Sequence, residues 1–236
     1  MKTRIDTEIE HSLIVDKDGL RAIQNFIFKQ YKHTEFTAKC VDGSILETDN
    51  IEEIISFSNP NFRHITQIVF EAQNDPSEGL TLEMESQSGF FGEPISLDVR
   101  SESDEKAVFV VKEIRDLLKE MKPWYDLLAR TPIWMVCLCI GIALCVMITI
   151  LRFMGRIPFY PGTASLLSMI TLGVSGLVVI GLLDYVKASL FPIIFFEIGK
   201  QKRKMERIKF WHKLLFGSIG LALLISILGN ILSRAL

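Results

Sequence analysis

Acidic side chains are nearly missing from the second part of this 236-residue chain. Residues 131–236 hold only 3 Asp and Glu against 11 Lys and Arg, whereas residues 1–130 hold 25 acidic and 15 basic side chains. The two parts therefore carry formal charges of +8 and −10, and the overall charge of −2 averages two unlike segments. With 49% hydrophobic residues and a mean hydropathy of +0.30, the chain is neither disordered nor a single soluble domain.

Cysteine is also scarce, with four in the whole chain. Cys137, Cys139 and Cys145 share one apolar run, and Cys40 stands alone, so the pattern excludes a disulfide scaffold. The Cys-x-Cys pair has no neighbouring histidine or acidic residue. We therefore predict no metal site there.

Sequence signatures of catalysis are absent as well. The chain contains no nucleophile elbow, no Walker loop, no dinucleotide-binding glycine motif and neither an HExxH nor a DxDxDG pattern. The four histidines are scattered. We expect a protein that is not an enzyme and that needs no cofactor or metal. Because the first part is strongly acidic, we also expect it not to bind duplex nucleic acid.

Three long apolar runs occupy the second part of the chain, at residues 133–151, 163–183 and 214–233. Each has at least 19 residues without a charged side chain, and a helix of about 20 residues reaches about 30 Å, the thickness of a bilayer core. These runs predict an all-α membrane domain of three transmembrane helices over residues 131–236.

The segment between the second and third runs, residues 184–213, is amphipathic and strongly basic. Positive charge near the ends of membrane helices favours the cytoplasmic side, so we expect this segment and the amino-terminal domain to be cytoplasmic and the carboxyl terminus outside. The basic residues are a topology signal that contacts anionic lipids, or else a site for an anionic effector or for the acidic domain. They are Lys200, Lys202, Arg203, Lys204, Arg207, Lys209 and Lys213.

The hydrophobic periodicity of residues 1–130 predicts an α+β domain, mainly an antiparallel sheet with covering helices. Its last helix, which Ser103 opens, is expected to lead almost directly into the first apolar run, with a break only at Thr131-Pro132. The predicted strands are 4–15, 36–41, 44–48, 65–72, 80–86 and 94–100, the earlier helices are 19–32 (capped by Asp18) and 51–57, and Asp42-Gly43 marks a hairpin.

Small polar residues recur at helical spacing within two of the apolar runs. Such stripes are either helix-packing seams or the lining of a pore in an assembly of several chains, and the sequence leaves both interpretations open. Pro192 lies in the short apolar stretch that follows, where we expect a hinge or gate beneath the membrane, or else a helix lying in the interface. The stripe residues are Ser168, Thr171, Ser175, Ser218, Ser226 and Asn230.

The segment LFPIIFFEIGKQKRKMERIKFW, residues 190–211, joins the expected cytoplasmic domain to a compact apolar unit. This arrangement resembles small bacterial membrane effectors of antiphage defence systems, such as Hailong-type channels. The resemblance implies a homo-oligomeric ion channel in a bacterial inner membrane, gated by a nucleotide, an oligonucleotide or a partner protein. The alternative is a non-conducting membrane anchor whose cytoplasmic domain recruits a protein partner.

Overall fold

The computed structural model describes residues 3–86, 94–137, 147, 150, 154 and 166–235. The chain forms two compact units, Met1–Pro123 with Ile193–Leu236 and Trp124–Pro192. The second unit is therefore inserted in the sequence of the first. The first unit takes residues from both sides of the boundary expected near residue 130.

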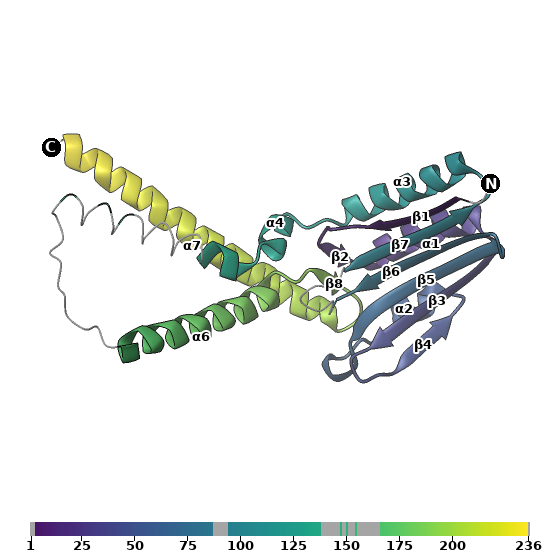
Figure 1. Ribbon diagram of the computed structural model, residues 1–236, viewed down its shortest axis with the longest axis horizontal. Coiled ribbons are helices and arrows are strands. Elements are labelled where there is room, and N and C mark those ends of the chain that lie inside the picture. Colours follow the sequence, from purple (N-terminus) through teal and green to yellow (C-terminus); the bar gives the residue numbers. More distant parts are fainter. Residues whose placement is uncertain are drawn as a thin grey trace. The chain divides into compact units, whose positions relative to one another are not determined.

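A six-stranded sheet is the centre of the first unit (Figure 1). Its strands follow the spatial order β1-β7-β6-β5-β3-β4, and every neighbouring pair is antiparallel. This part of the chain is thus an α+β fold built on an antiparallel sheet, as its hydrophobic periodicity predicts. The strands are β1 (Thr3–Glu8), β3 (His33–Cys40), β4 (Ile45–Thr48), β5 (Ile65–Asp75), β6 (Glu78–Glu85) and β7 (Ile95–Ser101).

The hairpin between β3 and β4 has the turn that the sequence predicts. Gly43 adopts a φ of 81°, a left-handed conformation that glycine adopts without steric cost. The Asp42 carboxylate accepts a hydrogen bond from the backbone N–H of Ser44 at 3.0 Å. Local chemistry therefore fixes the register of this strand pair.

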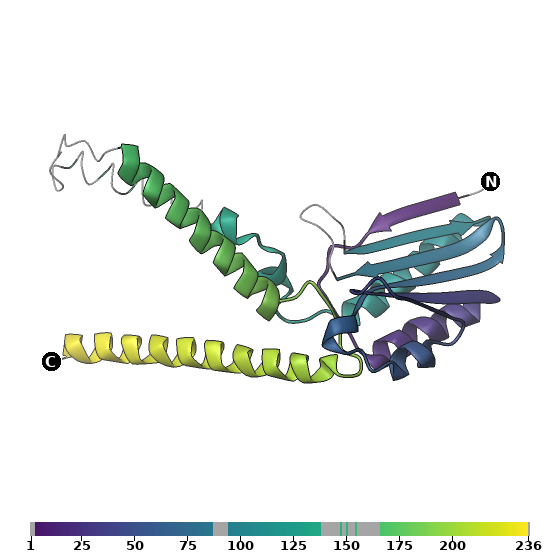
Figure 2. The ribbon, with the colours of Figure 1, turned by 90° about the horizontal axis from the view of Figure 1, so that it is seen from below.

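Helices α1 (Lys17–Gln30) and α3 (Asp104–Glu120) cover one face of the sheet, with the short helix α2 (Ile51–Ser56) beside α1 (Figures 1 and 2). The N-cap of α1 is Asp16, whose carboxylate accepts from Gly19 N at 2.8 Å, and not the predicted Asp18. A 3-10 turn, η1 (Asn61–Arg63), follows α2. The side chains that fill the space between helices and sheet include Leu20, Ile23, Ile27, Phe36, Phe70, Leu82, Leu97, Val110, Ile114 and Leu118.

The expectation that the last helix leads almost directly to residue 131 is wrong. Helix α3 ends at Glu120, and the chain then passes through Pro123 before a separate short helix, α4 (Asp126–Arg130), begins. A proline disfavours helical geometry at the residue before it, which explains the break. Pro123 is also the last residue of this part of the first unit.

The predicted strand 4–15 is two strands that belong to different sheets. After β1, Ile9 still donates its backbone N–H to Ile95 O at 3.1 Å, but the chain then leaves the large sheet. Residues Leu13–Val15 form β2, which pairs in parallel with β8 (Ile194–Phe196) from the far end of the sequence. Helix α7 (Gln201–Ala235) begins shortly after β8.

The second unit contains α4 and α6 (Leu166–Leu190), and residues 133–137 are also helical. The rings of Tyr125 and Phe191 meet edge to face at 5.5 Å. The Lys187 ammonium donates to the carbonyl of Thr131 at 2.6 Å. Many large apolar side chains of this unit are exposed, among them Trp124, Leu127, Val179, Leu182 and Tyr185.

The prediction of a three-span membrane domain for residues 131–236 is wrong. In the part of the chain that the structure describes, no helix combines the length and the apolarity that crossing a bilayer requires. Of the first predicted run, 133–151, most residues lie outside the described ones.

The other two runs are parts of longer helices. Run 163–183 falls largely within α6, which continues to Leu190, although residues 163–165 are outside the described part. Run 214–233 is the distal part of α7, which begins at Gln201 among the basic residues. Composition suggested a break between basic and apolar segments, but the backbone hydrogen bonds of a helix do not depend on side-chain charge and continue through both.

Candidate functional site

The segment after residue 193 is built into the α+β domain through a strand pair. β8 lies beside β2, with the backbone N–H of Leu13 donating to Ile193 O at 2.7 Å and that of Glu197 donating to Val15 O at 2.8 Å. Ile198, which follows, is fully buried in the main core. These contacts fix the point from which α7 starts.

A buried asparagine ties the start of α7 to the loop after α2. The amide of Asn59 donates to Ile198 O at 3.3 Å, and its side-chain oxygen accepts from Ile65 N at 2.8 Å. Asn59 has a φ of 45°, which asparagine tolerates better than most residues. Gln201, the first residue of α7, donates to Asn59 O at 3.4 Å.

Gly199 allows the two chain segments to approach closely. Its φ is +53°, and a Cβ at this position would lie 2.5 Å from the backbone oxygen of Ser58. Lys200 N donates to the same carbonyl at 2.9 Å. Only a residue without a side chain fits this position without moving the backbone.

One face of the first turns of α7 is buried. Gln201, Met205, Ile208 and His212 are all less than 9% exposed, and their spacing of four, three and four residues is that of one helical face. Met205 and Ile208 pack in a small cluster with Phe195 of β8. The amino-terminal turns of α7 are thus part of the domain's hydrophobic packing.

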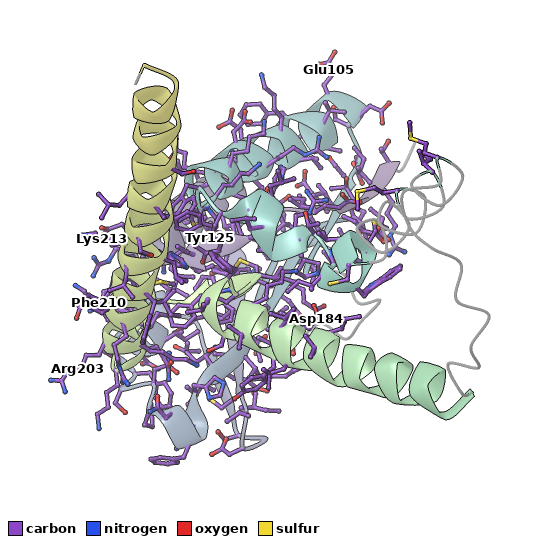
Figure 3. All side chains as sticks on the ribbon, turned by 90° about the vertical axis from the view of Figure 1, so that its left-hand side faces the viewer. Glu105, Tyr125, Asp184, Arg203, Phe210 and Lys213 are labelled. Atoms are coloured by element: carbon purple, nitrogen blue, oxygen red, sulfur yellow. The ribbon has the colours of Figure 1, made fainter. Side chains whose placement is uncertain are left out.

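All seven basic residues that the sequence singles out are exposed. Lys200 precedes α7, and the other six lie around the part of the helix circumference that the domain does not bury. Lys209 contacts Glu197 at 3.3 Å, and the Lys204 ammonium lies 6.0 Å from the centre of the Phe195 ring. Figure 3 shows Arg203 and Lys213 on the side of α7 that points away from the sheet. We call this exposed set, Lys200, Lys202, Arg203, Lys204, Arg207, Lys209 and Lys213, the basic face.

Exposed aromatic side chains follow on the same helix. Phe210 and Trp211 are 60% and 48% exposed, and their rings lie edge to face with centres 6.2 Å apart. Phe210 is on the side of α7 that also bears Arg203 and Lys213 (Figure 3). Beyond them the exposed residues become apolar, with Leu214, Phe216 and Leu221. Along α7 the surface therefore changes from basic through aromatic to aliphatic.

A hollow of 560 Å³ opens beside this junction, between the start of α1, the end of α3 and α7. Ile14, Leu117 and Met121 give it apolar walls, and its charged groups are of both signs. Among the residues that the structure describes, no group of histidine, cysteine and acidic side chains is arranged to hold a metal ion. The charged lining residues are Asp16, Asp18, Glu120, Lys122, Glu197 and Lys209.

The predicted small polar residues are distributed over two helices of different units. Ser168, Thr171 and Ser175 are on α6, and their side chains, like that of Asn230 on α7, lie outside the described part of the structure. Ser218 and Ser226 are exposed on α7, and the Ser218 hydroxyl donates to Leu215 O at 3.0 Å. The choice between packing seam and pore lining stays open.

Pro192 lies between helix α6 and strand β8. Because α6 ends at Leu190, the proline does not kink a continuous helix. It is the last residue of the second unit, and Ile193 begins the returning segment of the first. This placement matches the rule that helices end before a proline.

Sequence reasoning missed Asn59, Gly199 and Gln201. The sequence gives Asn59 no evident role, and Gly199 and Gln201 lie in the segment 184–213 that only its basic charge distinguishes. The usable signal was the spacing of Gln201, Met205, Ile208 and His212, which indicates a helix with one buried face.

Comparisons with known protein families, with curated proteins and with solved structures find no match.

Proposed function

We propose that the protein is a membrane-surface anchor that attaches to anionic lipid through the basic face of α7 and presents its α+β domain to a protein partner. The observation that carries this proposal is the contrast between the buried and the exposed sides of the first turns of α7. One face is buried in the domain, and the rest of the surface presents exposed basic residues together with Phe210 and Trp211.

A cluster of Lys and Arg residues on a helix is typical of segments that bind the headgroups of anionic lipids. Each Lys or Arg near an anionic surface contributes about 1 kcal/mol of attraction, and tryptophan is favoured at the boundary between headgroups and acyl chains. The exposed Leu214, Phe216 and Leu221 supply apolar surface that gains free energy when it leaves water. A nucleotide or oligonucleotide would use the basic side chains but not these apolar ones, so lipid is the favoured ligand.

The charge of the domain fits the same orientation. The face of the large sheet opposite α1 and α3 carries many carboxylates, and anionic lipid repels them. The domain would therefore turn this face towards solution, where an acidic surface selects a partner with a basic patch. These carboxylates are Asp6, Glu8, Glu35, Glu47, Glu71, Glu83, Glu85 and Asp98.

Vesicle co-sedimentation of the full-length protein tests the proposal. We expect stronger binding to vesicles containing phosphatidylserine than to phosphatidylcholine alone, and a decrease with rising salt concentration. The triple variant Arg203→Glu, Arg207→Glu, Lys213→Glu should lose the preference for anionic vesicles.

A matched control variant replaces three exposed lysines elsewhere on the domain with glutamate. They are Lys29, Lys39 and Lys112, and this variant should keep the preference for anionic vesicles. Equal binding to both kinds of vesicle, or preferential binding of a single-stranded oligonucleotide by the basic face, would overturn the proposal.

The gated channel expected from the sequence and its place in a bacterial inner membrane stay predictions. Release of a self-quenched dye from the same vesicles tests conduction.

A further inference from the structure

Strand β1 is an open edge of the large sheet. In the described part of the chain it pairs with β7 on one side and with no strand on the other (Figure 2). Ile9 N bonds to Ile95 O in the same register, and antiparallel pairs alternate between bonded and non-bonded positions. The backbone groups of Arg4, Asp6 and Glu8 therefore point to the open edge.

The side chains of β1 alternate between the two faces of the sheet. Ile5 and Thr7 lie on the face that α3 covers, where Ile5 packs against the core and Thr7 Oγ1 accepts a hydrogen bond from Arg115 at 3.2 Å. Arg4, Asp6 and Glu8 lie on the uncovered face and are exposed. An exposed edge with regular backbone groups is a template for another strand.

The signs of the charges on Arg4, Asp6 and Glu8 favour one register for pairing between β1 and the β1 strand of a second copy. A second copy that pairs antiparallel with β1 must place even-numbered residues opposite one another, because those carry the outward backbone groups. A twofold axis at Arg4 opposes two arginines. An axis at Asp6 opposes two aspartates but also places Arg4 opposite Glu8 twice, so it mixes repulsion with attraction. An axis at Ile5 opposes Arg4 to Asp6 twice and brings the two Ile5 side chains together.

We propose that two copies of the chain pair through β1, antiparallel and centred on Ile5, so that one sheet runs through both copies. Charged residues on edge strands commonly oppose such pairing. Here each neighbouring register contains one repulsive pair, Arg4 with Arg4 or Asp6 with Asp6, whereas the register centred on Ile5 opposes only unlike charges among the described residues. The proposal does not depend on lipid attachment, since no residue of the basic face takes part.

Register-specific cross-linking of the full-length protein in detergent tests the pairing. In a background in which the four native cysteines are alanine, Ile5→Cys should form a disulfide-linked dimer on mild oxidation, because directly opposed Cβ atoms lie about 5 Å apart. Thr3→Cys alone should not cross-link, but it should do so when mixed with Thr7→Cys, its expected partner position. The nearly isosteric threonine replacements keep the test informative if Ile5→Cys disturbs the core.

Charge exchange gives the second test. Arg4→Asp converts two attractive contacts into repulsive ones and should weaken dimerisation about tenfold, and adding Asp6→Arg should restore it. Asp98→Asn is the control for the loss of the ion pair between Arg4 and Asp98, at 3.1 Å, and should leave dimerisation nearly unchanged.

Two outcomes would overturn the proposal. One is the absence of both the Ile5 cross-link and the Thr3–Thr7 cross-link in chains whose circular dichroism is unchanged. The other is preferential linkage of differently tagged Ile5→Cys and Thr7→Cys chains, which would place the axis at Asp6. Failure of lipid binding would leave both results unaffected.

Discussion

The side chain of Asn59 donates to the backbone oxygen of Ile198 across 139 residues of sequence, at 3.3 Å and fully buried. This contact and the parallel strand pair β2–β8 attach the returning segment to the domain. The strength of that attachment determines how rigidly α7 is held.

Replacing Asn59 should destabilise the first unit. Asn59→Ala removes the acceptor for Ile65 N, whereas Ile198 O keeps the hydrogen bond that it accepts from Gln201 N at 3.1 Å. A buried group that loses its partner costs about 1–3 kcal/mol, so we expect a loss of about 1–3 kcal/mol in the free energy of unfolding, measured with denaturant and circular dichroism. Asn61→Ala, which removes the exposed Asn61 oxygen that accepts from Gln201 at 3.1 Å, should cost less than about 1 kcal/mol. Similar losses for both variants would contradict this account.

Alanine substitutions at two glycines distinguish the cost of backbone strain from the cost of steric crowding. Gly199 and Gly43 both have a positive φ, but a Cβ at Gly199 meets backbone atoms at 2.5 Å whereas a Cβ at Gly43 meets nothing within 4 Å. Gly43→Ala should therefore cost only the left-handed conformation, about 1–2 kcal/mol, and Gly199→Ala clearly more. Thermal unfolding of the two variants measures the difference. Equal melting temperatures would show that the loop at Ser58 moves freely.

The two faces of α7 should respond differently to truncation. Met205 is fully buried, and Met205→Ala should lower the free energy of unfolding by about 2–4 kcal/mol. Phe210 is 60% exposed, so Phe210→Ala should change stability by less than about 0.5 kcal/mol and should weaken vesicle binding. The test pairs denaturant unfolding with co-sedimentation. An unfolding loss at Phe210 as large as that at Met205 would show that both faces are packed.

Acid should weaken one ion pair of the domain. Hydrogen bonds from Lys106, and also from Asn74, lower the pKa of the Glu78 carboxyl. A carboxyl with a lowered folded-state pKa stabilises the fold fully above its unfolded-state pKa of about 4.3, and this contribution is lost as the pH falls through the lower value. We expect Glu78→Gln to reduce stability at pH 7 and to lessen its decline below about pH 4. Parallel stability curves for both proteins would refute the assignment.

The elements of residues 1–130 could be predicted because their signals are local. The Asp42-Gly43 turn, the cap at Ser103 and the alternation along β6 each lie within a few residues of what they determine. The split of residues 4–15 into β1 and β2 could not be seen. A three-residue strand has too little periodicity, and its partner β8 is far away in the sequence.

The basic segment shows the other limit of sequence reasoning. Its charge was visible, and all seven basic residues are indeed exposed. Charge alone separates this segment from the apolar run that follows it, but the buried face through Met205 and Ile208 makes it the first part of the same long helix. Asn59 and Gly199 owe their roles to a contact between segments that no local pattern contains.

The parallel pairing of Val15 with Phe196 also sets an order of events during synthesis. Translation proceeds at about 5–20 residues per second, so β2 waits roughly 10–35 s for its partner strand to leave the ribosome. Near the end of that interval the apolar residues of α6 leave the ribosome while the domain that precedes them still lacks its last strand. The nascent chain therefore exposes an unfinished core and an apolar helix at the same time, and such exposed hydrophobic surface is prone to aggregate.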